Sequence, residues 1–176
     1  MKKRRPSWIG GIQVDGETDG DVNWCGDMTV QVTEKYFLAS FKRSKPTSHI
    51  TKIQVNQFAH TSTSADYLAQ TELFDVLIEC KQITMKTKVP VFVLDRVTQE
   101  TKLLQWSGRY PRNKSYLFVV WWFGSKSKSH AFLIDIDSWI GARRGFVKKS
   151  MTLYDFMGLF KQFMCDIQDG FWVIKV

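Results

Sequence analysis

Residues 62–81, STSADYLAQTELFDVLIECK, decide how this chain folds. Their second half is a run of strand-forming residues that ends in Glu79, Cys80 and Lys81. Successive side chains of a strand point to opposite faces, so Glu79 and Lys81 emerge side by side on one face. Charged groups at the end of an apolar strand cost solvation free energy unless a solvated pocket or an ion receives them. The stretch therefore predicts a strand that carries a polar or metal site.

The same stretch predicts a hairpin over residues 67–81. The hairpin places Asp66 at the end of one strand, beside Glu79 and Lys81 on the neighbouring strand. Asp75 lies about four strand steps, roughly 13 Å, from Glu79, which is too far for the two carboxylates to share one ion. Asp66 and Glu79 are therefore the expected acidic pair.

Two acids and a lysine form a minimal set for phosphodiester hydrolysis. Mg²⁺ prefers oxygen ligands and keeps several waters, so one or two carboxylates and a backbone carbonyl can hold it beside a substrate phosphate. The ion activates water and polarises the phosphate, while a lysine can orient that water or offset developing charge. In a simpler interpretation, Glu79 and Lys81 form only a salt bridge on a strand.

Asp66, followed thirteen residues later by Glu79, Cys80 and Lys81 at the end of a hydrophobic strand, resembles the D…ExK signature of the PD-(D/E)XK nuclease superfamily. The hydroxyl residues 61–64 before Asp66 are similar to those of RecU- and Hjc-type Holliday junction resolvases, and the similarity covers roughly residues 55–155. It implies that Asp66 and Glu79 ligate Mg²⁺, with the Cys80 carbonyl as a further ligand and Lys81 as the catalytic lysine. Mn²⁺ would substitute for Mg²⁺.

Two further polar residues fit that resemblance. Glu34 falls in an expected first helix, residues 27–41, where related nucleases often place another acid near the metal. Gln99 lies one turn into a helix expected over residues 95–106, where similar resolvases carry a glutamine near the active site. Each is also explained as an ordinary solvated helix residue, and both alternatives stay open.

The order of elements predicts one α/β or α+β domain with a mixed central sheet flanked by helices, which the resemblance makes restriction-endonuclease-like. Residues 116–123, YLFVVWWF, are apolar on both faces, as in a central strand covered on both sides; the two tryptophans could instead stack on DNA bases. Thr152 and Asp155 have the spacing of a capping box that starts a helix with a broad apolar face. Other strands are expected at residues 50–58, 89–94, 131–136 and 171–176, the third followed by a basic segment. Residues 1–26 are expected to form a loosely packed arm before a nuclease domain at residues 27–176.

The formal net charge of +8 favours an anionic partner, and nucleic acid is the commonest. The basic residues gather in expected loops and at element ends, where they can reach phosphates or serve as ordinary solvated charges. The positions that we expect to contact DNA are Lys86, Lys88, Arg109, Arg112, Arg143 and Arg144.

The remaining composition bounds the class of protein. The 3 cysteines and 3 histidines are scattered, which indicates neither a zinc site nor a disulfide framework. No apolar run approaches the roughly 20 residues that span a membrane, and the basic N-terminus lacks the apolar region of a signal peptide. We expect a cytoplasmic protein without a membrane segment, of cellular or of viral (phage) origin.

These features together predict a magnesium-dependent, structure-selective DNA endonuclease, and the resemblance implies a Holliday junction resolvase of DNA recombination and repair. Two symmetric cuts in a four-way junction require a two-fold homodimer with two active sites. One alternative is another PD-(D/E)XK nuclease, of the restriction, repair or nickase type, which would also cut linear duplex. The other is a non-catalytic DNA-binding protein, which would not need the ion.

Overall fold

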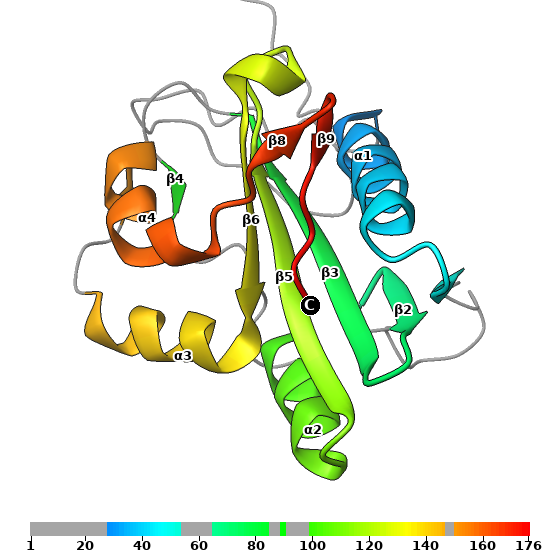
Figure 1. Cartoon of the computed structure of the whole chain (residues 1–176). Helices are drawn as coiled ribbons and strands as arrows, with labels where there is room; N and C mark the ends of the chain where they lie inside the picture. The colour runs from blue at the N-terminus through cyan, green and yellow to red at the C-terminus, as the bar shows by residue number, and fades with distance from the viewer. Residues whose placement is uncertain (1–27, 54–64, 85–88, 91–98, 147–149) are drawn as a thin grey trace, which may run out of the picture.

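A five-stranded sheet forms the centre of the computed structural model, which describes residues 28–53, 65–84, 89–90, 99–146 and 150–176 (Figure 1). Strands β3 and β5 run parallel, and the other neighbouring pairs run antiparallel. The predicted mixed central sheet is thereby confirmed. In spatial order its strands are β1 (His49–Lys52), β2 (Tyr67–Gln70), β3 (Asp75–Ile83), β5 (Asn113–Trp121) and β6 (His130–Asp135).

Helices cover both faces of this sheet (Figure 1). Helix α1 (Met28–Ser44) packs Phe37 and Phe41 on the face that carries Ile78 and Phe118. The opposite face is covered by α2 (Thr101–Arg109), α3 (Ile136–Gly145) and α4 (Leu153–Phe160). The short elements are β4 (Val89–Pro90) paired with β7 (Ser150–Met151), β8 (Ile167–Gln168) paired with β9 (Phe171–Trp172), and the 3₁₀ turns η2 (Lys126–Lys128) and η3 (Lys161–Phe163).

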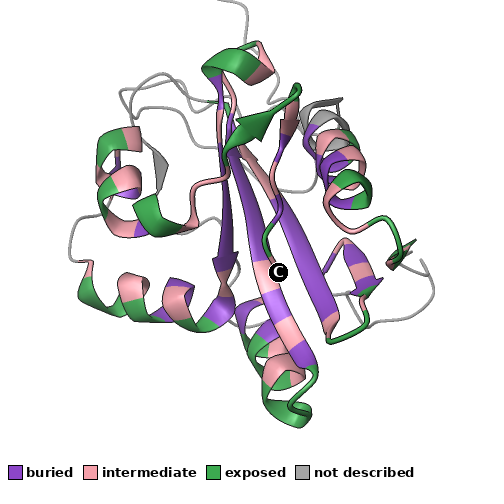
Figure 2. Cartoon of the chain, viewed as in Figure 1, coloured by how far each residue is buried: buried purple, intermediate pink, exposed green. Residues whose placement is uncertain are grey.

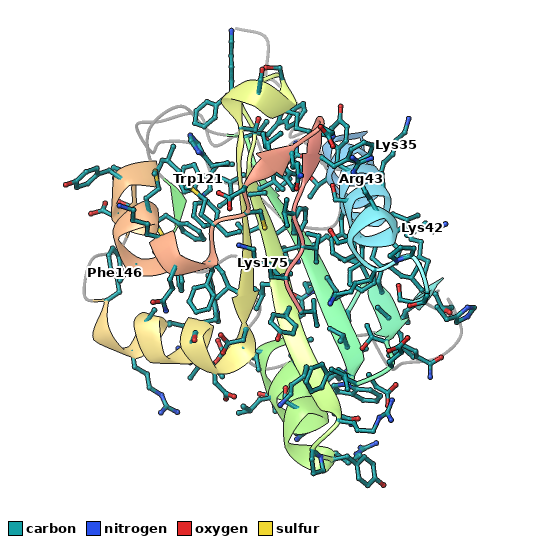
Figure 3. The ribbon with its side chains drawn as sticks, in the orientation of Figure 1. Lys35, Lys42, Arg43, Trp121, Phe146 and Lys175 are labelled. Carbon is teal, nitrogen blue, oxygen red and sulfur yellow. The ribbon has the colours of Figure 1, made fainter. Side chains whose placement is uncertain are left out.

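Strand β5 is the central strand that its two apolar faces predict, and its second half is buried on both sides (Figure 2). Trp121 is 1% exposed and meets Phe156 edge to face, between the sheet and α4 (Figure 3). Trp122 is half-buried and stacks on Tyr36 of α1. Both tryptophans therefore pack against the protein itself.

The predicted capping box is present at the start of α4. The Asp155 amide donates to the Thr152 Oγ1 atom at 3.1 Å, and the Thr152 amide donates to the Asp155 carboxylate at 2.9 Å. Phe156 and Phe160 of this helix are buried against Phe132 of β6 and neighbouring rings. Much of the apolar face of α4 is thus buried against the sheet.

Three elements differ from the sequence expectations. Helix α3 occupies residues for which only a basic segment was expected; Asp135 caps it by accepting from the Ser138 amide, and Trp139 and Ile140 bury one side of it. Helix α2 runs on to Arg109, into a predicted loop. The expected last strand is reduced to β9, which pairs with β8 in a sheet of its own.

Several expectations fall outside the described residues: the N-terminal arm, residues 54–58 and 91–94 of two predicted strands, and the start of the second predicted helix. Within the described part of the chain, no helix is long and apolar enough to cross a membrane.

Candidate active site

The site lies where β2 leaves the edge of β3. The pairing of these strands extends to Tyr67 opposite Ile78, and the Asp66 amide continues it by donating to the Ile78 carbonyl at 3.0 Å. The next amide that points to this edge, that of Cys80, donates instead to the Asp66 Oδ2 atom at 2.7 Å. The Asp66 carboxylate thus accepts the hydrogen bond that a backbone carbonyl of a neighbouring strand would otherwise accept. This contact holds Asp66 at the end of β2, beside β3, as the predicted hairpin requires.

Glu79 and Lys81 lie side by side on β3, as the strand periodicity predicts. The Lys81 Nζ atom is 2.6 Å from Glu79 Oε1, and the Gln99 amide donates to the same oxygen at 3.0 Å. Glu79 is buried, whereas the Lys81 side chain keeps 24% of its surface exposed. A buried carboxylate is therefore held by two donors, one of which a substrate could still reach.

Burial disfavours the charged forms of the two carboxylates in this cluster. It raises the pKa of Glu79 to about 7; the Lys81 ammonium acts against this rise, and the charge of Asp66 adds to it. Burial also raises the pKa of Asp66, although the Cys80 amide stabilises its charged form. Two desolvated carboxylates, of which the charge of Asp66 disfavours ionisation of Glu79, form a site where a bound cation would be stabilised.

The donor set fits a magnesium ion better than a zinc ion. The Cys80 thiol is buried in the core on the α1 side of the sheet, away from the carboxylate of Glu79. Among the described residues, no three His, Cys, Asp or Glu side chains are grouped closely enough to hold an ion by themselves. Two carboxylates completed by a backbone oxygen, water and phosphate are the pattern that Mg²⁺ shows in proteins.

Glu34 of α1 reaches the same corner of the sheet. Its carboxylate is 10% exposed, lies 2.5 Å from the Lys52 Nζ atom and accepts a hydrogen bond from the Tyr67 hydroxyl at 3.2 Å. It lies close enough to Asp66 for its charge to contribute to the raised pKa of that residue. The structure therefore brings Glu34 close to Asp66, one member of the acidic pair.

Lys52 and Tyr67 are two residues of this corner that the sequence did not single out. Burial raises the pKa of Tyr67 above its ordinary value, and the hydrogen bond to Glu34 raises that of Lys52. The sequence predicts Lys52 only as part of a strand at residues 50–58, and no local spacing connects either residue to α1. Glu34 and Lys52 thus form a second acid–lysine pair, besides Glu79 and Lys81, and Tyr67 donates a hydrogen bond to its carboxylate.

The residues expected to contact DNA are unequally placed. Arg109 and Arg144 are exposed at the ends of α2 and α3, and Arg112, 57% exposed, lies 3.5 Å from Asp75. The Arg143 side chain is 16% exposed and lies 2.6 Å from Glu100, so Arg144 is the exposed member of that pair. Lys86, Lys88 and the hydroxyl residues 61–64 lie outside the described residues.

Comparisons with known proteins show similarities in sequence and in fold. No family model matches the chain. A protein of Saccharomyces cerevisiae, named as a candidate subunit of the ISWI chromatin-remodeling complex, is 32% identical over an alignment of 102 residues that covers 54% of this chain and 9% of that protein. The crystal structure of Hjc, a Holliday junction resolvase of Archaeoglobus fulgidus, superposes with a TM-score of 0.50 over 75% of this chain and 92% of Hjc, at 8% identity.

The chain shares the fold of Hjc. At 8% identity this similarity shows the fold alone, and it agrees with the mixed central sheet flanked by helices that the order of elements predicts. The yeast protein is matched over less than a tenth of its length, so its assembly is a property of that protein only.

Proposed function

We propose that this chain is a divalent-cation-dependent DNA endonuclease of the PD-(D/E)XK superfamily that cuts four-way junctions. The observation that carries the proposal is the convergence of Asp66, Glu79 and Lys81 at the free edge of β3, within an Hjc-like fold. That edge is where an acid pair, a backbone carbonyl and a lysine can meet a phosphate.

Asp66 and Glu79 would hold the cation. The Asp66 Oδ2 atom is engaged by the Cys80 amide, which leaves Oδ1 for an ion. The N–H and C=O of one strand residue point to the same side, so the Cys80 carbonyl is a reasonable further ligand at this edge. When bound, the ion supplies Lewis-acid polarisation of the phosphate.

The other residues orient the substrate and the ligands. Lys81 uses one of its three donors on Glu79, so the others can point toward water or a phosphate oxygen. Gln99 restrains the Glu79 carboxylate from the other side of the cluster. Burial of Glu79 excludes water around the carboxylate, which strengthens its interaction with any cation.

The proposed DNA partner follows from the net charge of the chain, and the proposed homodimer follows from the paired cuts that a junction requires. A net charge of +8 favours a polyanion, and the exposed Arg109, Arg112 and Arg144 are proposed phosphate contacts, as are Lys86 and Lys88. Paired cuts in a junction require two active sites, so we expect a homodimer.

A second candidate function is DNA binding without cleavage. The Lys81 ammonium lies 2.6 Å from the Glu79 carboxylate, which is also the geometry of a purely structural salt bridge on a strand. In that case the cluster would neither need nor bind a divalent cation.

Cleavage of an end-labelled four-way junction, beside linear duplex of the same sequence, tests the proposal. With Mg²⁺ we expect paired symmetric nicks in the junction only, and none in EDTA. Glu79→Ala should lower the rate at least about 100-fold, whereas Glu72→Ala, which removes an exposed acid from the β2–β3 turn, should leave it unchanged.

The other outcomes decide between the alternatives. Equal cutting of the duplex would indicate a general PD-(D/E)XK nuclease of the restriction, repair or nickase type. Tight binding without cutting, with or without Mg²⁺, would favour the non-catalytic function.

A further inference from the structure

A buried ion pair outside the acidic cluster joins α2 to α3. The Arg143 Nη2 atom lies 2.6 Å from Glu100 Oε1, and the two side chains are 16% and 9% exposed. Glu100 directly follows Gln99, whose amide donates to Glu79 at 3.0 Å. One peptide unit therefore connects this ion pair to a residue that touches the candidate catalytic carboxylate.

Gln99 and Glu100 lead directly into the first turn of α2. Glu100 stands at the N-cap position of α2, yet its side chain caps no backbone amide of the helix. Its carboxylate is directed to Arg143 instead, so the turn is fixed by a contact with another helix rather than by α2 itself.

Arg143 is attached to a rigid part of the core. It belongs to the last turn of α3, just before Phe146 (Figure 3), and the same helix buries Trp139, which stacks on Phe160 at 5.6 Å. The small cavity beside Arg143 is otherwise lined by apolar side chains, namely Trp139, Ala142, Phe146, Met151, Leu159 and Phe160. A guanidinium in such surroundings needs its carboxylate, and the core holds it in place.

The ion pair between Arg143 and Glu100 is better explained by the position that it gives Gln99 than by a contribution to the stability of the fold. Buried ion pairs gain little over apolar residues of the same volume, because desolvation offsets their attraction. The second oxygen of Glu100 is buried without a hydrogen-bond partner among the described residues, which adds to the cost. What the pair does fix is the direction of the turn that presents Gln99.

We propose that Arg143 and Glu100 are positioning residues that hold Gln99 against Glu79. They touch neither substrate nor cation and act only through the Gln99 amide. The catalytic consequence rests on the proposed function, whereas the structural consequence does not.

A spectroscopic test needs no activity. The side-chain amide signal of Gln99 is followed by ¹⁵N NMR in EDTA and assigned with Gln99→Ala. Arg143→Met should move this signal to the position of a solvent-exposed glutamine, and so should Glu100→Gln, the milder variant if Arg143→Met does not fold. Ile140→Val weakens the packing of the same helix without touching the ion pair, and should leave the signal in place.

Single-turnover cleavage of the junction tests the catalytic consequence. Arg143→Met should lower the rate about 10-fold with unchanged DNA affinity, and the double variant with Gln99→Ala should be no slower than Gln99→Ala alone. An unmoved Gln99 signal in Arg143→Met, or losses that multiply in the double variant, would overturn the proposal. If the wild type cuts no DNA, the proposed function fails, while the NMR signal still decides whether Arg143 positions Gln99.

Discussion

Glu79 occupies an unfavourable place for a carboxylate. It is 4% exposed, and burial raises its pKa to about 7 even with the Lys81 ammonium beside it. A charged form that folding disfavours lowers the free energy of unfolding. Such a residue is better explained by a function than by the stability of the fold.

The sign of this effect gives a pH-dependent prediction. Between its ordinary value of 4.5 and about 7, folded Glu79 keeps a proton that the unfolded chain releases, so stability should fall as pH rises through this window. Glu79→Gln removes the penalty. Chemical denaturation in EDTA should show the variant more stable than wild type by about 1 kcal/mol at pH 8 and no more stable at pH 4.

Glu72→Gln serves as the control, because it neutralises an exposed carboxylate in the adjacent turn. Equal stabilisation by both substitutions would show that net charge, rather than the burial of Glu79, causes the effect.

Sequence reasoning finds the residues that local rules connect. The period of two along β3 puts Glu79 beside Lys81, and the hairpin brings Asp66 to them. Lys52 and Tyr67 contact Glu34 across 18 and 33 residues, and no pattern in the sequence joins them. The contact between Arg143 and Glu100 is hidden for the same reason, since the two residues lie 43 positions apart.

At the scale of elements, α4 shows how a local signal can specify a helix. Thr152→Ala removes the oxygen that accepts from the Asp155 amide and the hydroxyl that donates to the Asp155 carboxylate, while the backbone amide of residue 152 can still donate to that carboxylate. We expect a loss of about 1 kcal/mol in the free energy of unfolding, measured by urea denaturation.

Tyr154→Ala is the matched control, since this side chain is 85% exposed in the same helix. It should change stability much less than Thr152→Ala. An equal loss in the two variants would contradict a specific contribution of the cap, because alanine at position 154 has a higher helix propensity than tyrosine.

Helix α3 shows where such signals fail. Its N-cap, Asp135, is also the last residue of β6, so the start of the helix is hidden within the end of a strand. Its basic last turn suggested a surface segment, although Trp139 and Ile140 are buried. Tertiary packing of that apolar side, rather than a boundary signal, forms the helix.

At the scale of the whole molecule, the sequence predicted the sheet and its centre. A strand apolar on both faces must be covered on both sides, and β5 is covered by α1 on one face and by α2, α3 and α4 on the other. Strand order did not follow from the same rule, because pairing between β3 and β5 depends on contacts across the intervening residues 84–112. The Hjc-like fold is the result of that pairing.

The central claim is that Asp66 and Glu79 together bind a divalent cation. Isothermal titration of Mn²⁺ into the protein at pH 8, with the shift in melting temperature recorded in parallel, tests this most directly. We predict binding and stabilisation of the wild type, and loss of both in Asp66→Asn and in Glu79→Gln, which would then be the more stable protein only in EDTA. Absence of binding to the wild type, or equal binding to all three proteins, would contradict the account.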